Sequence, residues 1–376
     1  MSNYFRYLPF AGFFFVCSSA RAILLSVLPL KALSLMGNAQ LVSVLFFMVS
    51  ACGVAVSLSV PMILQRIGLH RCFLLSVFAM VASVVLLWTE AMWSFAAGMV
   101  LHVFGVTSME VVLSLYIMQR IPRRQLPEFE PLRMVSAIVA LSIGPWLGVY
   151  LQSRVADWLP YLIAIGGTVA TLIYFRWLGL QQMSLPERLL PAGNPLRHIG
   201  RFFLQPRLRL AWGLILTRSS WWMMFILYTP IYARESGLGE LMGAAIVSIG
   251  SAGWFARRYS LRRLMYMGFT VAAGMSLLVF AASGTPTVAI VLLAFAALGA
   301  TMLDGSGHVL FLRAVHPLER SEMTGVFQTY RDVANLAVPG FFAVLLKFFA
   351  LPVIFVGAAG WMLVGTFFSR YIPRRM

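Results

Sequence analysis

Long apolar runs alternate with short polar breaks along nearly the whole chain, and this pattern predicts helices that cross a membrane. A hydrocarbon core about 30 Å thick needs about 20 apolar residues in a helix. The chain has twelve such runs, each with few charged residues, so we predict an all-α membrane protein with twelve transmembrane helices. The predicted spans cover approximately residues 8–34, 39–63, 72–90, 93–118, 132–151, 157–180, 208–233, 237–256, 261–283, 286–312, 323–348 and 350–371.

One connection between the predicted spans is longer and more polar than the others. Residues 181–207 are rich in proline and arginine, which is typical of a linker outside the membrane. The segment divides the spans into six and six. We therefore predict an N-terminal six-helix bundle over residues 1–180, a cytoplasmic linker over 181–207 and a C-terminal six-helix bundle over 208–376.

The composition excludes several classes of protein. Hydrophobic residues make up 60% of the 376 residues and charged residues 11%, whereas soluble domains carry about 25% charged residues. This contrast excludes a soluble enzyme, a disordered chain and a fibrous protein. An outer-membrane barrel is excluded as well, because its strands are about 10 residues of alternating polarity.

The sequence carries no motif for a metal or a cofactor. It has no Gly-x-x-x-x-Gly-Lys loop for ATP and no Ser/His/Asp set with suitable spacing, and its cysteines Cys17, Cys52 and Cys72 belong to no Cys/His cluster. We therefore expect no enzymatic activity, no bound metal and no cofactor.

The net charge of +17 arises in the connections between the spans. With the N-terminus in the cytoplasm, most of the 29 basic residues fall in cytoplasmic segments, and Lys31, Arg154, Arg234 and Lys347 face the opposite side. Cytoplasmic loops of membrane proteins carry such an excess. We therefore predict a multi-pass protein of the cytoplasmic membrane with both termini in the cytoplasm. We expect it to be a monomer that contacts membrane lipids, with no nucleic-acid partner.

Motifs of the first half recur in the second half at the same spacing. Such internal self-similarity predicts a duplicated structural unit, here a bundle of six helices that occurs twice. The matched positions are Ser18, Ser19 and Pro29 with Ser219, Ser220 and Pro230; Arg66 and Arg71 with Arg258 and Arg263; and Gly105, Glu110 and Pro145 with Gly299, Asp304 and Pro339.

The connection after the second span carries a recognisable motif, QRIGLHR over residues 65–71. Arg66, Gly68 and Arg71 match the loop signature of the major facilitator superfamily, in which an acidic residue stands at the position of Gln65. The layout of the spans resembles the same family over essentially the whole chain. The resemblance implies a gating or conformational role for Arg66, Gly68 and Arg71.

The fifth span carries a second motif of this family. Gly144, Pro145 and Gly148 form the core of a G-P-x-x-G signature that the family associates with antiporters and exporters. The resemblance is to bacterial drug and metabolite exporters, and it gives these three residues a conformational role. It also implies two parallel halves that rock around a midplane site, with spans 1, 4, 7 and 10 lining the central cavity.

Ionisable residues inside the spans are candidates for function. A charged residue at the centre of a span costs about 2.5–3.5 kcal/mol on insertion scales, so it normally faces a partner or a water-filled cavity. Arg21, Glu110, Arg218 and Asp304 lie well inside spans 1, 4, 7 and 10. From their depths we expect Arg21 to reach Glu110 and Arg218 to reach Asp304, and His308 follows Asp304 by one helical turn.

Two interpretations of these charges compete. In the structural one, each pair neutralises itself and joins two helices. In the functional one, Glu110 or Asp304 takes up and releases protons, and the neighbouring arginine holds either the carboxylate or an anionic substrate, but not both at once.

Span 11 and span 7 carry further candidates. Arg331 and Asp332 lie on a polar stripe of span 11, where a helix–helix ion pair competes with a gating role. Trp222 and Phe225 share the helix face of Arg218 in span 7. An aromatic wall beside a guanidinium would suit an amphipathic organic anion or a planar solute, whereas tryptophan is also ordinary at a lipid interface.

The sequence therefore predicts a secondary active transporter that works by alternating access. We expect proton-coupled efflux of a small organic solute, with a proton gradient as the energy source. One alternative is proton-coupled or facilitated uptake of an organic anion or metabolite. Another, from a different class, is a lipid-handling or assembly factor that uses the same fold without transport and would tolerate neutral residues at all four charged positions.

Overall fold

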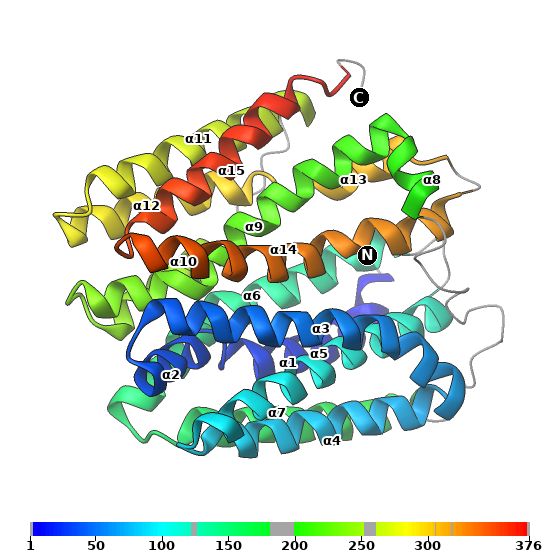
Figure 1. Ribbon diagram of the computed structural model, residues 1–376. Coiled ribbons are helices and arrows are strands. Elements are labelled where there is room, and N and C mark those ends of the chain that lie inside the picture. The colour runs from blue at the N-terminus through cyan, green and yellow to red at the C-terminus, as the bar shows by residue number, and fades with distance from the viewer. Residues whose placement is uncertain are drawn as a thin grey trace. The chain divides into compact units, whose positions relative to one another are not determined.

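A computed structural model describes residues 3–121, 126–180, 199–251, 261–304, 306–316 and 319–373, and the regular elements in these ranges are all helices. In chain order (Figure 1) they are α1 (Asn3–Ala22), α2 (Val27–Met36), α3 (Ala39–Ile67), α4 (Leu69–Trp88), α5 (Met92–Arg120), α6 (Leu126–Arg154), α7 (Leu159–Trp177), α8 (Ile199–Leu204), α9 (Pro206–Glu235), α10 (Glu240–Ser251), α11 (Leu261–Ala281), α12 (Pro286–Thr301), α13 (Ser306–Ala314), α14 (Arg320–Phe348) and α15 (Val353–Ser369).

Each of the twelve predicted spans corresponds to a helix or to two helices joined by a short break. Within the described residues, eight segments are long and apolar enough to cross a membrane, and α10, α12 and α15 are shorter apolar helices. The remaining span, α14, is 29 residues long but carries the polar stripe of span 11. The chain is therefore an all-helical, multi-pass membrane protein, as the hydropathy pattern predicted.

The first predicted span is not one regular helix, because the backbone tightens between α1 and α2. The N–H groups of Leu24 and Leu25 bond to carbonyls three residues back, at 3.2 Å each, instead of four. Two glycines of α6 pack against this break. A methyl group at Gly144 would lie 2.5 Å from Cβ of Ala22, and one at Gly148 would collide with the carbonyl oxygen of Ile23. The G-P-x-x-G motif therefore lets α6 approach the backbone of the break.

The tenth predicted span is also interrupted, so the expectation of a continuous helix over 286–312 was wrong. The N–H groups of Leu303 and Asp304 bond three residues back, at 3.0 and 3.1 Å, which ends α12 in a tight turn. The carbonyl of Leu298 accepts both the backbone N–H of Met302 at 3.3 Å and the hydroxyl of Thr301 at 2.8 Å, so a side chain reinforces the end of the helix. Asp304 therefore lies between two helices rather than inside one.

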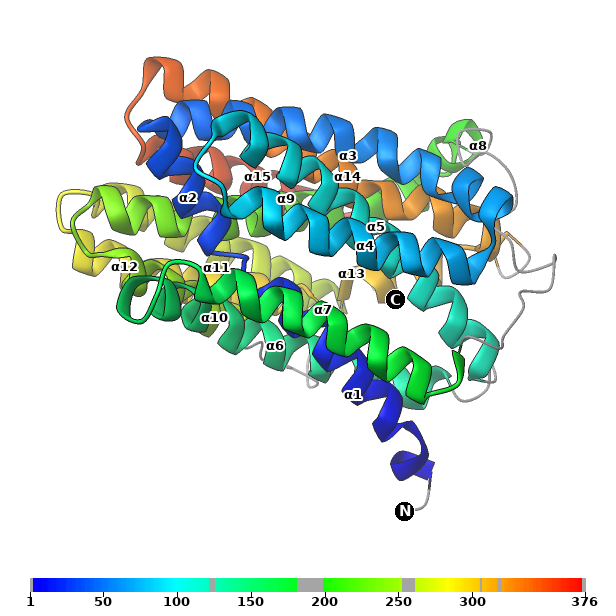
Figure 2. The ribbon, with the colours of Figure 1, turned by 90° about the horizontal axis from the view of Figure 1, so that it is seen from below.

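The chain forms two compact units. The first comprises Met1–Leu28 and Met48–Ala192, and the second comprises Pro29–Phe47 and Gly193–Met376. In the first unit α1 packs on α6 and α7, and α4 packs on α5 and α7 (Figure 2). The predicted linker over 181–207 is described only from residue 199 onward.

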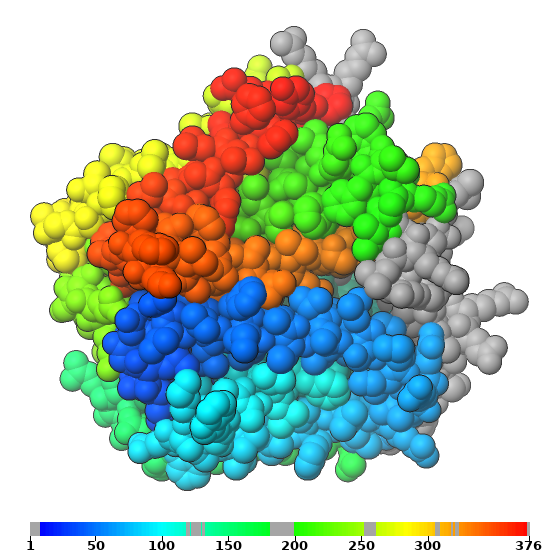
Figure 3. All heavy atoms as spheres, in the orientation of Figure 1, coloured from blue at the N-terminus to red at the C-terminus, as the bar shows by residue number. Residues whose placement is uncertain are grey.

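In the second unit α11 packs on α12 and α15, and α9 packs on α10, α14 and α15. The outer side of α15, red in Figure 3, exposes Leu363, Val364 and Phe367. Large apolar side chains on the outside of a helix are what contact with lipid tails requires. The beginning of this unit, Pro29–Phe47, contributes α2 and the first turns of α3.

Candidate functional site

The first unit holds an ion pair between α1 and α5. Nη1 of Arg21 lies 2.6 Å from Oε1 of Glu110, and the two side chains are 23% and 43% exposed. Arg21 stands in the last turn of α1, where the carbonyl end of the helix favours a cation. Its Nε is buried and has no hydrogen-bond partner among the described residues.

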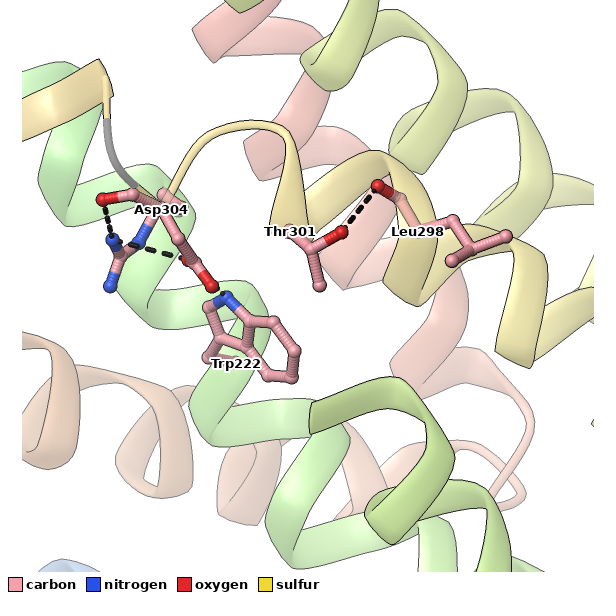
Figure 4. A network of polar contacts seen from close by, with 5 residues as sticks. Trp222, Leu298, Thr301 and Asp304 are labelled. Atoms are coloured by element: carbon pink, nitrogen blue, oxygen red, sulfur yellow. Dashed lines mark hydrogen bonds and ion pairs between the residues drawn. The ribbon is translucent and has the colours of Figure 1, made fainter. Parts of the chain in front are cut away.

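The second unit holds the matching pair between α9 and the break after α12. Nη1 of Arg218 lies 3.2 Å from Oδ1 of Asp304 and donates to the main-chain carbonyl of the same residue at 3.3 Å. The indole N–H of Trp222 donates to the same Oδ1 at 3.0 Å (Figure 4). The side chains of Arg218 and Asp304 are 17% and 39% exposed. Nε of Arg218 is again buried without a partner among the described residues.

The two predicted pairs are therefore present, and they are built in opposite ways. In the first unit the arginine stands at a helix break and the carboxylate lies on a continuous helix, whereas in the second unit the arginine lies on the continuous helix and Asp304 lies in the break. In both, Nη1 of the arginine contacts the carboxylate, and Nε of the same guanidinium has no hydrogen-bond partner among the described residues. A guanidinium presents five donors in a planar fork, so each arginine retains donors for a second acceptor.

The aromatic residues near Arg218 do not form one exposed wall. Trp221 is fully buried and donates to the Ser276 hydroxyl at 3.0 Å. Phe225 is also fully buried, with its ring stacked on Trp221 at a centroid distance of 5.0 Å. Trp222 is half-buried. Of the two predicted wall residues, Trp222 is the one with exposed surface on the helix face of Arg218. The buried ring of Phe225 packs against Trp222 in a T-shaped contact.

Three further predicted residues are His308, Arg331 and Asp332. His308 lies in α13, but its side chain is outside the described part of the structure. Arg331 is exposed and Asp332 is half-buried, both on α14. The structure therefore places the polar stripe on α14 without assigning its role.

The residues of the two family motifs lie at a turn and at a close helix contact. Gly68 connects α3 to α4 with φ of +80°, a backbone conformation that glycine adopts without strain. Arg66 and Arg71 are exposed on either side of it. Pro145 is buried in α6 between the two glycines that contact the break in span 1.

Sequence analysis missed a set of contacts at one end of the second unit. The hydroxyls of Ser43 and Tyr228 lie 2.6 Å apart and are buried. Arg234 pairs with Glu240 at 2.9 Å and donates to the Leu30 carbonyl at 3.4 Å. These contacts hold Pro29–Phe47 against α9. No local signal predicts a hydrogen bond between residues that are 185 positions apart.

Comparison with known proteins gives one family and several solved structures. The sequence profile of the Major Facilitator Superfamily matches residues 10–339. None of the curated protein sequences matches the chain.

The similar solved structures are transporters that cover nearly the whole chain. The structure of the human organic anion transporter MFSD10 (TETRAN) is 18% identical, with a TM-score of 0.65 over 97% of this chain and 99% of that one. The nucleoside transporter NupG is 13% identical, with a TM-score of 0.72 over 97% and 98%. A POT family transporter in complex with 5-aminolevulinic acid is 13% identical, with a TM-score of 0.70 over 95% and 94%. At these identities the likeness establishes the fold.

Proposed function

The chain belongs to the Major Facilitator Superfamily and is a membrane transporter of small molecules rather than an enzyme, and on this premise we propose that it exports an organic solute in exchange for protons. We place it in the cytoplasmic membrane of a bacterium with both termini in the cytoplasm, which the distribution of basic residues supports. The proposed mechanism is alternating access by the two six-helix halves.

The observation on which the proposal rests is the partial exposure of two arginine–carboxylate pairs, which are neither fully exposed to solvent nor fully buried. Arg21 and Arg218 are about one-fifth exposed, and Glu110 and Asp304 are about two-fifths exposed. A pair that only joins two helices needs no access to water, whereas ionisable residues on a proton or substrate pathway face a water-filled cavity. Partial exposure lets water deliver a proton to the carboxylate, and protonation removes the charge that the arginine neutralises. The state of the pair can thus follow the pH on the side to which it opens.

The free edge of each guanidinium favours an anionic substrate. Arg21 and Arg218 hold their carboxylates through Nη1, and their Nε groups are buried without a partner among the described residues. A carboxylate or phosphate takes two parallel N–H donors from such an edge. Because these Nε groups are buried, a substrate reaches them only when the ion pair opens, which agrees with the exclusive choice expected from the sequence. The likeness to an organic anion transporter agrees with this substrate class, and uptake of an organic anion is the alternative function.

Transport by purified protein in proteoliposomes tests the proposal. A thermal-shift screen of organic acids first supplies a substrate, because a ligand of the native state raises its stability. We expect a pH gradient to drive accumulation of this substrate by the wild type. Glu110→Gln and Asp304→Asn should each lose the gradient-driven component by at least about tenfold and keep exchange of labelled for unlabelled substrate.

Glu240→Gln is the matched control, because it neutralises an acid of similar exposure that pairs with an arginine at a helix end. We expect it to transport like the wild type. Unchanged gradient-driven transport in both the Glu110 and Asp304 variants would refute proton coupling through these pairs. The direction of the response to the gradient separates antiport from symport.

A further inference from the structure

Two donors converge on a single oxygen of Asp304 in the break after α12. Nη1 of Arg218 and Nε1 of Trp222 lie 3.2 and 3.0 Å from Oδ1 (Figure 4). Trp222 follows Arg218 by four residues on α9, so both side chains leave the same helix face and reach the same carboxylate. The two contacts fix the carboxylate relative to α9, while the second bond of Arg218 fixes the main chain of Asp304.

We propose that Trp222 is a positioning residue for Asp304, whose indole N–H holds the carboxylate in the ionised form and so sets the pH at which this group takes up a proton. The inference deepens the proposed function and rests on it, because it concerns the group proposed to exchange protons. An indole N–H can only donate. A bond to a carboxylate is about twice as strong as a bond between neutral groups. Protonation of Asp304 therefore weakens the Trp222 bond, and removal of that bond makes protonation easier.

The surroundings of Asp304 offer few competing charges. Arg218 and Trp222 are the side chains that contact its carboxylate within the described part of the chain. Of the helices packed on α12 and α13, α9 carries its other charged residues near its two ends, α11 carries its basic residues in its first turn, and α10 carries Glu240, which pairs with Arg234. On α13 itself, Arg313 stands in the last turn, and the side chain of His308 is not among those described.

A neighbouring tryptophan provides a natural contrast. Trp221 donates its indole N–H to the hydroxyl of Ser276, a neutral acceptor, at 3.0 Å. Trp222 donates to a carboxylate at the same distance. Replacement of either residue by phenylalanine removes one indole donor and keeps an aromatic ring. Trp222→Phe therefore removes a bond that stabilises the charged carboxylate of Asp304, whereas Trp221→Phe removes a bond to a neutral hydroxyl.

The test is an infrared titration of the full-length protein in lipid nanodiscs, without substrate. The carboxylic-acid band of Asp304 is the band missing in Asp304→Asn. In Trp222→Phe we expect its midpoint to rise by about one pH unit, a tenfold gain in proton affinity that corresponds to about 1.4 kcal/mol. In Trp221→Phe we expect the wild-type midpoint. A wild-type midpoint in Trp222→Phe overturns the inference and leaves an aromatic contact as the role of this residue.

A second measurement follows the indole N–H signals of the wild-type protein. In protein labelled with ¹⁵N-tryptophan, the signal of Trp222, identified by its absence in Trp222→Phe, should move as Asp304 titrates. The signal of Trp221 should stay in place. A Trp222 signal that ignores the titration contradicts the inference. Neither measurement involves transport. The inference about Trp222 can therefore fail while proton-coupled transport holds, and it can hold while proton-coupled transport fails.

Discussion

A single guanidinium is stable at membrane depth only where another group offsets its charge. Insertion of an unpaired arginine costs about 2.5–3.5 kcal/mol, and Arg21 and Arg218 each meet this cost with one carboxylate. The sequence was sufficient to predict both pairs, since depth follows from position in a span. It was not sufficient to predict which nitrogen makes the contact, nor that Trp222 bonds to Asp304, because these depend on rotamers and on a break in the partner helix.

Removal of one partner of the first pair should cost more than removal of both. In Arg21→Met, Glu110 remains half-buried without its cation, and we expect the free energy of unfolding to fall by about 2 kcal/mol. This is less than the about 3–5 kcal/mol for a fully buried pair, because Glu110 is 43% exposed. In Arg21→Met with Glu110→Met we expect a smaller loss. Denaturant unfolding in detergent measures both, and a double variant less stable than Arg21→Met would contradict the account.

At the level of secondary-structure elements, two helix breaks determine where the charged groups stand. The two breaks put Arg21 at the end of α1 and Asp304 between α12 and α13. Hydropathy predicted all twelve spans but neither break, because apolar residues continue through both of them. A break is set by backbone hydrogen bonds and by the neighbouring helix, here by the close approach of Gly148 to the carbonyl of Ile23. The motif containing Gly148 was visible in the sequence, whereas the contact it makes was not.

The glycine contact at the first break yields a prediction about stability. Gly148→Ala places a methyl group against main-chain atoms that cannot move aside, and we expect a loss of about 1–3 kcal/mol, as for overpacking. Gly166→Ala on α7 is the matched control, because its methyl group would meet nothing within 4 Å. There we expect no loss, and a gain of up to about 1 kcal/mol from helix propensity. Equal thermal stability of the two variants would argue against a tight contact at Gly148.

The family and the helical membrane fold agree with the sequence at the scale of the whole molecule. Each could be predicted from the sequence because spans, loop charges and motif spacing are properties of the chain alone. The substrate could not be predicted from the sequence, because similar folds at 13–18% identity belong to transporters of organic anions, nucleosides and other solutes. We propose that specificity depends on a few side chains such as Trp222 and on the donors of Arg21 and Arg218 that have no partner among the described residues. The central claim is that water and solute reach these groups.

Thiol labelling tests this claim most directly. In a background with Cys17, Cys52 and Cys72 replaced by alanine, cysteine is placed at Arg21 together with Glu110→Gln, or at Arg218 together with Asp304→Asn, so that no charge is left alone. Val112→Cys on α5 is the buried control, because Val112 is 0% exposed. We predict that a membrane-impermeant thiol reagent labels positions 21 and 218 at least about tenfold faster than position 112, and that substrate slows this labelling. Labelling at both positions as slow as at position 112, at every pH and with or without substrate, would contradict the transport mechanism proposed here.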